Sequence, residues 1–284
     1  MFKRLVSKWK KISVRGGTMA MLVCVNTVII LLLSLGAFAF FQKGFVNEIA
    51  GARSDVLRQI AERARQFKTN IYTLSNLYYN DSRFLEAAEN LDEENKGEFF
   101  HYMDELTEQL QVSFNQVNLD FYVVYLSENG IGYCSVPAPE DYDYMNPKTK
   151  IWYRDLYHSE GAIVDVASYR DRLLGITAYT AVRTVLNRQG DITGYLMISA
   201  DERQLYQMYA EVISEESNIY VADGEGRIVS SNRDTIIGFS YFHMENLEEH
   251  SGEQNHIITK ISRRDALFTR YSDPESGFTV FEEI

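Results

Sequence analysis

The spacing of apolar residues changes along this chain, and each pattern predicts a different element. The first pattern is an uninterrupted apolar run. No Asp, Glu, Lys or Arg occurs between Gly16 and Gln42. The core of the run, residues 19–41, would extend about 35 Å as an α-helix, which is enough to cross a hydrocarbon layer of about 30 Å. We therefore expect a transmembrane helix over residues 19–41.

A cleaved signal peptide is the alternative interpretation of this run. Ala37-Phe38-Ala39 resembles the small-residue cleavage site of such a peptide. However, the run is longer than the roughly 7–15 residues of a signal-peptide core, and it continues into a helical pattern without a turn. The sequence therefore favours a retained membrane anchor.

The second pattern is an amphipathic stripe that follows the apolar run. Apolar residues recur at steps of three and four positions, from Phe45 through Ile60 and Phe67 to Tyr78. This spacing predicts a long helix over residues 45–79. Helical patterns at residues 82–91 and 95–111 follow it, so residues 42–118 are predicted to form a long amphipathic helix and a helical connector.

The third pattern consists of short runs rich in strand-forming residues. Residues 119–126 and 131–135 flank a turn that contains Asn129-Gly130, a strong hairpin signal. A short helix is expected from Asn146-Pro147 to Gly161. Further strands are expected at residues 162–169, 173–185 and 193–198. Residues 119–200 are thus predicted to form a five-stranded antiparallel sheet with helices on one side.

The same order of elements recurs later in the chain. A helix expected at residues 202–213 leads to strands at 218–222 and 227–231, and three more strands are expected at 256–261, 267–271 and 278–281. Repetition at this scale indicates two copies of one module. The predicted fold class is therefore α+β, with two antiparallel-sheet modules in tandem at residues 119–201 and 202–284.

Charge divides the chain into two unlike parts. The first 18 residues contain six basic residues and no acidic one, so the remainder holds 22 of the 28 basic and all 40 acidic residues, a net charge of −18. Positive residues stay on the cytoplasmic side of a membrane span. We therefore expect a cell-membrane protein with a cytoplasmic basic arm at residues 1–18 and an extracytoplasmic bulk. The acidic bulk disfavours nucleic acid as a partner.

Motifs for catalysis and metal binding are absent from the sequence. No Gly-x-Ser-x-Gly elbow, P-loop or zinc-binding spacing occurs. The two cysteines are Cys24, in the apolar run, and Cys134, beyond it, so no disulfide is expected within the extracytoplasmic part. The loop Asp223–Gly226 has the acidic spacing of a calcium loop but lacks the further ligands, which favours a hairpin turn. We predict no catalytic residue, no metal and no cofactor.

The order of the predicted elements resembles that of the double-Cache (dCache) extracytoplasmic sensor domain, which consists of two PAS-like modules. The resemblance covers roughly residues 42–284. It is carried by Ile151-Trp152-Tyr153, Tyr169-Arg170-Asp171, Gly194–Ile198 and Ile219–Val229. The N-terminal region also resembles YesM-like bacterial sensor histidine kinases. Methyl-accepting chemotaxis receptors and diguanylate cyclases share the same sensor module.

The resemblance implies a ligand site in the membrane-distal module, between its short helix and the open face of its sheet. Amino-acid-binding members carry an Arg, one residue and Trp-Tyr, followed by Tyr-x-Asp and a further Asp. In this chain the implied ligand-binding residues are Lys150 in place of the arginine, Trp152, Tyr153, Tyr169, Asp171, and Ser199 near the final aspartate. Lysine lacks the two parallel donors of arginine, and serine offers no charge to an ammonium group.

Simpler roles remain open for these residues. A Trp-Tyr pair on a short helix fits a plug that seals the sheet as well as a surface that stacks on a ligand. Asp171 fits an exposed ion pair with Arg170 or Arg172, which would contribute little.

Together, these features predict the ligand-sensing portion of a bacterial transmembrane receptor, most simply a two-component sensor histidine kinase that continues past residue 284 into a second membrane span. The alternatives are a chemotaxis receptor, a diguanylate cyclase or a membrane-tethered binding module without signalling output. The expected partners are a small-molecule ligand or a solute-binding protein, the membrane, and a second copy in a homodimer formed through the long helix. Ligand closure would shift the helix at 45–79 relative to the C-terminal strand.

Overall fold

The chain divides into two compact units, residues 1–52 and residues 53–284. The computed structural model describes residues 14–137, 152–156, 159, 161–172, 174–214, 216–241, 256–261 and 264–284. Both sheets and all helices after the first lie in the second unit.

Helix α2 (Val14–Tyr79) begins in the first unit. Gly17–Phe38 is the one helical segment of the described chain that is long and apolar enough to cross a membrane, judged by its length and composition. Its large side chains are exposed, including Leu33 at 68% and Phe38 at 67%. Such a continuous apolar surface is unfavourable in water and suits a lipid environment. The segment overlaps the predicted span at residues 19–41.

In the second unit α2 presents one apolar stripe to the rest of the domain. Ile60, Phe67, Ile71 and Tyr78 are each at most 1% exposed. These positions follow the predicted steps of three and four residues, because such steps return to the same face of a helix. The predicted long helix and its buried stripe are therefore confirmed.

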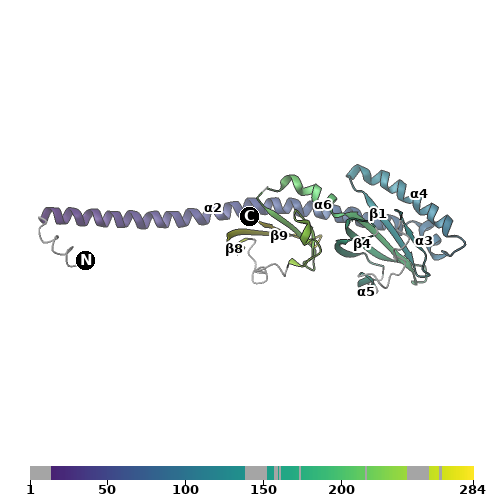
Figure 1. The fold of residues 1–284 in the computed structure, drawn as a ribbon. Helices are drawn as coiled ribbons and strands as arrows, with labels where there is room; N and C mark the ends of the chain where they lie inside the picture. The colour runs from purple at the N-terminus through teal and green to yellow at the C-terminus, as the bar shows by residue number, and fades with distance from the viewer. Residues whose placement is uncertain are drawn as a thin grey trace. The chain divides into compact units, whose positions relative to one another are not determined.

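Two further helices follow α2 and form an antiparallel pair (Figure 1). Helix α3 (Ser82–Glu89) is capped by Asp81, whose carboxylate accepts hydrogen bonds from the backbone N–H groups of Arg83 and Phe84 at 2.8 and 3.1 Å. Helix α4 (Lys96–Phe114) continues into the 3₁₀ turn η1 (Asn115–Val117). Asn118, in the left-handed conformation with φ 52°, then redirects the chain toward the first sheet.

The first sheet is antiparallel and has five strands in the order β2-β1-β5-β4-β3. Its strands are β1 (Phe121–Ser127), β2 (Gly132–Cys134), β3 (Val164–Arg170), β4 (Thr177–Leu186) and β5 (Ile192–Asp201). The predicted five-stranded sheet is confirmed. The strand expected from residue 173 begins instead at Thr177, because Gly175, with φ 68°, donates to the Asp171 carbonyl and forms a turn there.

The second sheet repeats this topology with the order β7-β6-β10-β9-β8. Its elements are α6 (Glu202–Tyr209), η3 (Ala210–Val212), β6 (Asn218–Ala222), β7 (Ile228–Ser231), η4 (Asp234–Ile236), β8 (His256–Ile261), β9 (Arg264–Ser272) and β10 (Thr279–Glu283). Each strand occupies the place of the strand five earlier in the first sheet. The predicted duplication of one module is therefore confirmed.

One large core joins α2, α3, α4 and one face of each sheet, and it includes Leu74, Phe84, Tyr125 and Val221. A smaller core lies on the opposite face of the first sheet, where α5 (Tyr153–Leu156) covers it (Figure 1). The expectation of helices on only one side of this sheet is therefore wrong. The predicted start of that helix, Asn146-Pro147, lies outside the described residues.

Candidate functional site

The face of the first sheet that meets α5 is the region where the family resemblance places a ligand. We call it the α5 face, and its buried cluster consists of Val124, Leu126, Trp152, Leu156, Val166, Val182, Tyr195 and Met197. Side chains alternate between faces along a strand, so Tyr195, Met197 and Ser199 share this face, whereas Leu196 and Ile198 belong to the main core. The side chains of Tyr195, Met197 and Ser199 on β5 thus form the floor of the α5 face, with an aromatic ring at one end and a hydroxyl at the other.

Trp152 and Tyr153 lie at the Tyr195 end of this floor. Both rings are centred 5.7 Å from the ring of Tyr195, Trp152 in a tilted and Tyr153 in an edge-on arrangement. Trp152 is 2% exposed, whereas Tyr153 is partly exposed. The Tyr195 hydroxyl donates to Glu128, and burial together with this carboxylate raises the pKa of Tyr195. Trp152 therefore contributes to the core of the α5 face, and Tyr153 lines its edge.

A β-bulge in β3 decides where Tyr169 points. Val166 pairs with Thr180 but Tyr169 pairs with Ala178, so two residues of β3, 167 and 168, lie opposite the single residue Tyr179 of β4. The extra residue returns Tyr169 to the α5 face, where it packs at the edge of the buried cluster. Ser168 turns the other way, and its hydroxyl donates to the Val229 carbonyl of the second sheet at 2.7 Å.

Asp171 follows directly after β3 and is 7% exposed. Its carboxylate accepts hydrogen bonds from the Tyr169 hydroxyl and from the Leu174 backbone N–H, both at 3.0 Å. Within the described part of the chain, no ion pair joins Asp171 to Arg170 or Arg172. The alternative of an exposed ion pair is therefore wrong. Asp171 is a buried carboxylate that is hydrogen-bonded to Tyr169.

Ser199 lies near the opposite end of the floor from Tyr195. Its hydroxyl is 2.8 Å from that of Thr180, the directly paired residue on β4, and both side chains are buried. Ser199 lies four positions along β5 from Tyr195, which corresponds to about 14 Å. The α5 face therefore has an aromatic end, an aliphatic middle and a hydroxyl end, with Asp171 and Tyr169 beyond β4.

The structure thus places five of the six implied site residues on or beside one face. Trp152 and Tyr153 cluster at the aromatic end, and Tyr169 and Asp171 are hydrogen-bonded to each other near the other end. Lys150 lies outside the described residues. This face therefore presents apolar and aromatic side chains together with a buried carboxylate and buried hydroxyl groups.

Sequence reasoning missed three further groups on the α5 face. Tyr195 is the aromatic residue against which both rings of α5 pack, and Cys134 pairs with Val124 at the edge of the cluster. Burial, aided by the negative charge of Asp171, raises the pKa of the Cys134 thiol. Thr184 pairs with Tyr195, and its hydroxyl has no hydrogen-bond partner among the described residues. The alternation of strands β4 and β5 was the signal that could have identified Thr184 and Tyr195.

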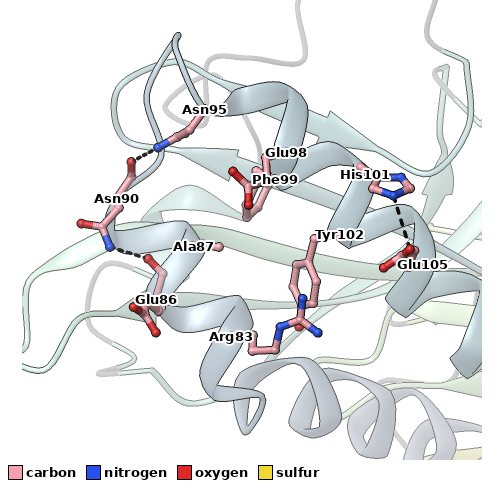
Figure 2. Close-up of a pocket in the computed structure, with 10 residues that line it drawn as sticks. All are labelled: Arg83, Glu86, Ala87, Asn90, Asn95, Glu98, Phe99, His101, Tyr102 and Glu105. Atoms are coloured by element: carbon pink, nitrogen blue, oxygen red, sulfur yellow. Dashed lines mark hydrogen bonds and ion pairs between the residues drawn. The ribbon is translucent and has the colours of Figure 1, made fainter.

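A separate cleft lies between α3 and α4, on the outer side of this helix pair (Figure 2). Its volume is about 510 Å³. Figure 2 shows the Arg83 guanidinium against the Tyr102 ring, 4.8 Å from its centre, and an ion pair of 3.3 Å between His101 and Glu105. The cleft is lined mainly by exposed polar side chains, and none of the predicted site residues belongs to it.

Comparison with known proteins shows what this fold is similar to. No protein-family model matches the chain, and no curated protein sequence does. The ligand-binding domain of the Campylobacter jejuni chemoreceptor Tlp3, solved with L-valine, matches with a TM-score of 0.63 and 18% identity, over 86% of this chain and 96% of that one. The ligand-binding domain of the Pseudomonas fluorescens chemoreceptor CtaA, solved with L-serine, matches with a TM-score of 0.61 and 10% identity, over 84% and 97%.

A second CtaA structure, with L-isoleucine, matches with a TM-score of 0.62 and 12% identity, over 86% of this chain and 96% of that one. At these identities the similarity establishes the fold. The chain therefore has the dCache fold, a long helix followed by two sheet modules, as the sequence predicted.

Proposed function

We propose that this chain is the ligand-sensing portion of a membrane-anchored bacterial receptor, and that it binds a small molecule on the α5 face. The observation that carries the proposal is the convergence of Trp152, Tyr153, Tyr169 and Asp171 on one face of the first sheet. The shared fold with amino-acid-bound chemoreceptor domains supports it.

A free amino acid or a similar small amine is the ligand class that fits this face. The aliphatic floor made by Val124, Val182 and Met197 suits an apolar side chain. The Asp171 carboxylate suits an ammonium group, and the proposed role of Lys150 is to face a carboxylate. Ser199 lies near the position of the final aspartate of amino-acid-binding dCache domains, and it offers a hydroxyl in place of a second carboxylate that would bind an ammonium group. This replacement favours a ligand with a single amine and one further polar group.

The proposed arrangement in the membrane follows from charge and composition. The apolar helix at residues 19–41 would anchor the chain, and the basic arm at residues 1–18 would stay in the cytoplasm. Residues 42–118 would form the stalk helix and connector, residues 119–201 the membrane-distal module and residues 202–284 the membrane-proximal one. Homodimers would form along α2. Since the apolar stripe from Ile60 to Tyr78 packs into the domain's own core, the dimer would use a face of α2 that this core leaves exposed.

The output of the receptor is a separate question from its ligand. A histidine kinase fits the N-terminal resemblance, and a chemotaxis receptor fits the similar solved structures, which are domains of chemoreceptors. Joining residues 1–284 to the signalling part of a known kinase, and in parallel to that of a known chemoreceptor, would distinguish the two. The native output domain is expected to be of the type whose fusion protein signals when the ligand is added.

A thermal-shift screen of the full chain in detergent or nanodiscs tests the proposal. The panel comprises L-valine, L-isoleucine, L-leucine, L-norvaline, L-serine and small amines. A ligand at 100 times its Kd should stabilise the fold by about 2.7 kcal/mol, which is readily seen as a rise in Tm. Asp171→Asn should abolish this rise, because it removes the buried carboxylate that is proposed to face the ammonium group.

A matched control separates binding from folding. Asp223 is a turn aspartate of the second module, between β6 and β7, and its carboxylate accepts from the backbone N–H groups of Glu225 and Arg227, each at 2.9 Å. Asp223→Asn should therefore leave the ligand-induced rise intact. If Asp171→Asn and Trp152→Phe both retain the full rise, the site is elsewhere. If no compound in the panel raises the Tm, the next test is whether the chain senses its ligand through a solute-binding protein. That protein should then co-purify with the chain from the native cell envelope.

A further inference from the structure

Arg183 is a buried cation on the face of the first sheet opposite α5, where α2 packs. It is 7% exposed and belongs to β4. Its guanidinium lies 3.6 Å from the centre of the Tyr79 ring, and burial lowers the pKa of the group. Among the described residues it forms no ion pair with a carboxylate, and its Nε has no hydrogen-bond partner. A guanidinium without a counterion is costly to bury, so its contacts call for an explanation.

The contacts of Arg183 join two segments that are far apart in the sequence. Nη1 donates to the side-chain Oδ1 of Asn76 at 3.0 Å, in the last turn of α2. Nη2 donates to the backbone carbonyl of Gly161 at 2.8 Å, between α5 and β3. The planar fork of arginine holds both acceptors at once, which lysine cannot do in the same geometry.

A short series of hydrogen bonds continues from Gly161 to the aromatic pair. The Ala162 backbone N–H donates to the Ser159 carbonyl at 2.8 Å, and the Ser159 N–H and hydroxyl both donate to the Leu156 carbonyl at 3.0 and 2.9 Å. The Leu156 N–H donates to the Trp152 carbonyl at 3.2 Å. Gly161 itself has φ 83°, and an added Cβ would lie 3.4 Å from Leu186 and 3.5 Å from the Tyr79 hydroxyl. The described residues between Trp152 and Ala162 are therefore anchored at the end that Arg183 holds.

We infer that Arg183 is a positioning residue that seats α5, with Trp152 and Tyr153, over the sheet and links this seat to the last turn of α2. The inference rests on the proposed function for its biological meaning, since α5 covers the proposed ligand site. In that setting, a displacement of α5 on ligand binding would displace the last turn of α2 through the hydrogen bonds of Arg183. A displacement of α2 would likewise change how α5 packs on the sheet. The physical link itself needs no ligand and is tested without one.

Trp152 is a natural reporter for this link. The chain has two tryptophans, Trp9 and Trp152, so Trp9→Phe leaves Trp152 as the only one. In this background, the full chain in detergent or nanodiscs is compared with Arg183→Met, Arg183→Lys and Asn76→Ala. Two readouts are followed. One is acrylamide quenching of Trp152, and the other is amide hydrogen exchange within residues 156–162, read at Leu156, Ser159 and Ala162, whose N–H groups donate the hydrogen bonds given above.

Arg183→Met should raise exchange across residues 156–162 about tenfold, because a hydrogen bond to a charged group contributes at least about 1.4 kcal/mol, a factor of ten in the local opening equilibrium. Quenching of Trp152 should rise with it. Arg183→Lys should give an intermediate change. Asn76→Ala is the informative variant: Asn76 is exposed on a helix, so alanine is tolerated there, yet the change should still loosen residues 156–162.

Arg63→Met is the matched control. Arg63 is also an arginine of the second unit whose guanidinium donates to a backbone carbonyl of another element, that of Met208. This variant should leave residues 156–162 and Trp152 unchanged. The inference is overturned if Asn76→Ala leaves both readouts at the wild-type level, or if Arg63→Met loosens residues 156–162 as much as Arg183→Met does. A ligand-induced rise in Tm that both Asp171→Asn and Trp152→Phe retain, together with a positive exchange result, would refute the proposed ligand site and leave the positioning role in place.

Discussion

The ammonium group of Lys68 lies 2.6 Å from the carboxylate of Asp165, and this ion pair joins α2 to β3 of the first sheet. Lys68 also donates to the Ser276 carbonyl at 3.0 Å, in the turn between β9 and β10 of the second sheet. Asp165 accepts a second hydrogen bond from the Tyr179 hydroxyl at 2.8 Å. The stalk helix and both modules therefore meet at one polar contact, beside the rings of Tyr72 and Phe278.

Replacing Lys68 by Met should destabilise the second unit by about 1–3 kcal/mol, because it leaves a largely buried carboxylate without its cation. The two side chains are 18% and 22% exposed, so solvent screens the pair only in part. Urea unfolding of the variant measures the loss. The double variant Lys68→Met/Asp165→Asn should recover part of it, with a coupling energy of about 1 kcal/mol.

The control for this prediction is an exposed ion pair of the same type. Lys96 pairs with Glu93 at the start of α4, with exposures of 48% and 74%. Lys96→Met should change the free energy of unfolding by less than about 0.5 kcal/mol. Equal losses in Lys68→Met and Lys96→Met would mean that the contact between helix and sheets contributes nothing beyond an ordinary surface pair.

The stability of the domain should depend on the protonation of Glu202, the first residue of α6. Its side chain is 2% exposed and accepts a hydrogen bond from Ser230 of β7, and burial raises its pKa to about 7. Between pH 4.5 and 7 the folded state therefore binds the proton more strongly than the unfolded state. The free energy of unfolding should fall as pH rises through this window, by up to about 3 kcal/mol.

Glu202→Gln removes this proton and should flatten the dependence. Urea unfolding at pH 5 and pH 8 should show a smaller fall for the variant than for the wild type, because the other carboxylates contribute equally to both. Asp201→Asn is a nearby control, since Asp201 caps α6 from a more exposed position. A wild-type protein that is as stable at pH 8 as at pH 5, with no difference from Glu202→Gln, would contradict the prediction.

Arg53 should matter most at neutral and higher pH. It forms a 3.3 Å ion pair with Glu282 of the last strand, and Glu282 is 1% exposed with a pKa raised by burial and lowered in part by Arg53. Arg53→Met should cost about 3 kcal/mol at pH 8, where the carboxylate is left charged and buried. The loss should shrink as pH falls, because burial raises the pKa of Glu282 and favours its neutral form. Arg53→Met/Glu282→Gln should recover stability at pH 8, as followed by thermal unfolding.

Gly194 is required where β5 enters the first sheet. A Cβ atom there would lie 2.5 Å from the Leu126 carbonyl oxygen and 2.5 Å from the Tyr125 hydroxyl. Gly194→Ala should therefore destabilise the domain by about 1–3 kcal/mol through overpacking. Gly97→Ala in α4 is the control, since no atom lies within 4 Å of its Cβ position, and it should stabilise by about 0.4–1 kcal/mol. Thermal unfolding should show a lower Tm than wild type for Gly194→Ala and a higher Tm for Gly97→Ala.

The sequence by itself determined the elements and their order. The steps of three and four residues identified the stripe of α2 from Ile60 to Tyr78, because an apolar face has to be buried wherever the helix packs. Strand-forming runs and turn residues located the strands, and their repetition predicted two modules with one topology. The resemblance to dCache domains then placed Trp152 and Asp171 in one region, and the structure brings that region together on the α5 face.

Only the tertiary structure decided how the side chains of that region are oriented. Alternation along β3 predicts a face for each residue only if the register is unbroken, and the bulge between Val166 and Tyr169 breaks it. For this reason Tyr169 turns to the α5 face and Ser168 to the second sheet. The contacts of Arg183 with Asn76 and Gly161, and of Lys68 with Asp165, join residues that local pattern cannot relate. Such pairs form because folding brings distant segments together, and no periodicity within one segment encodes the partner in another.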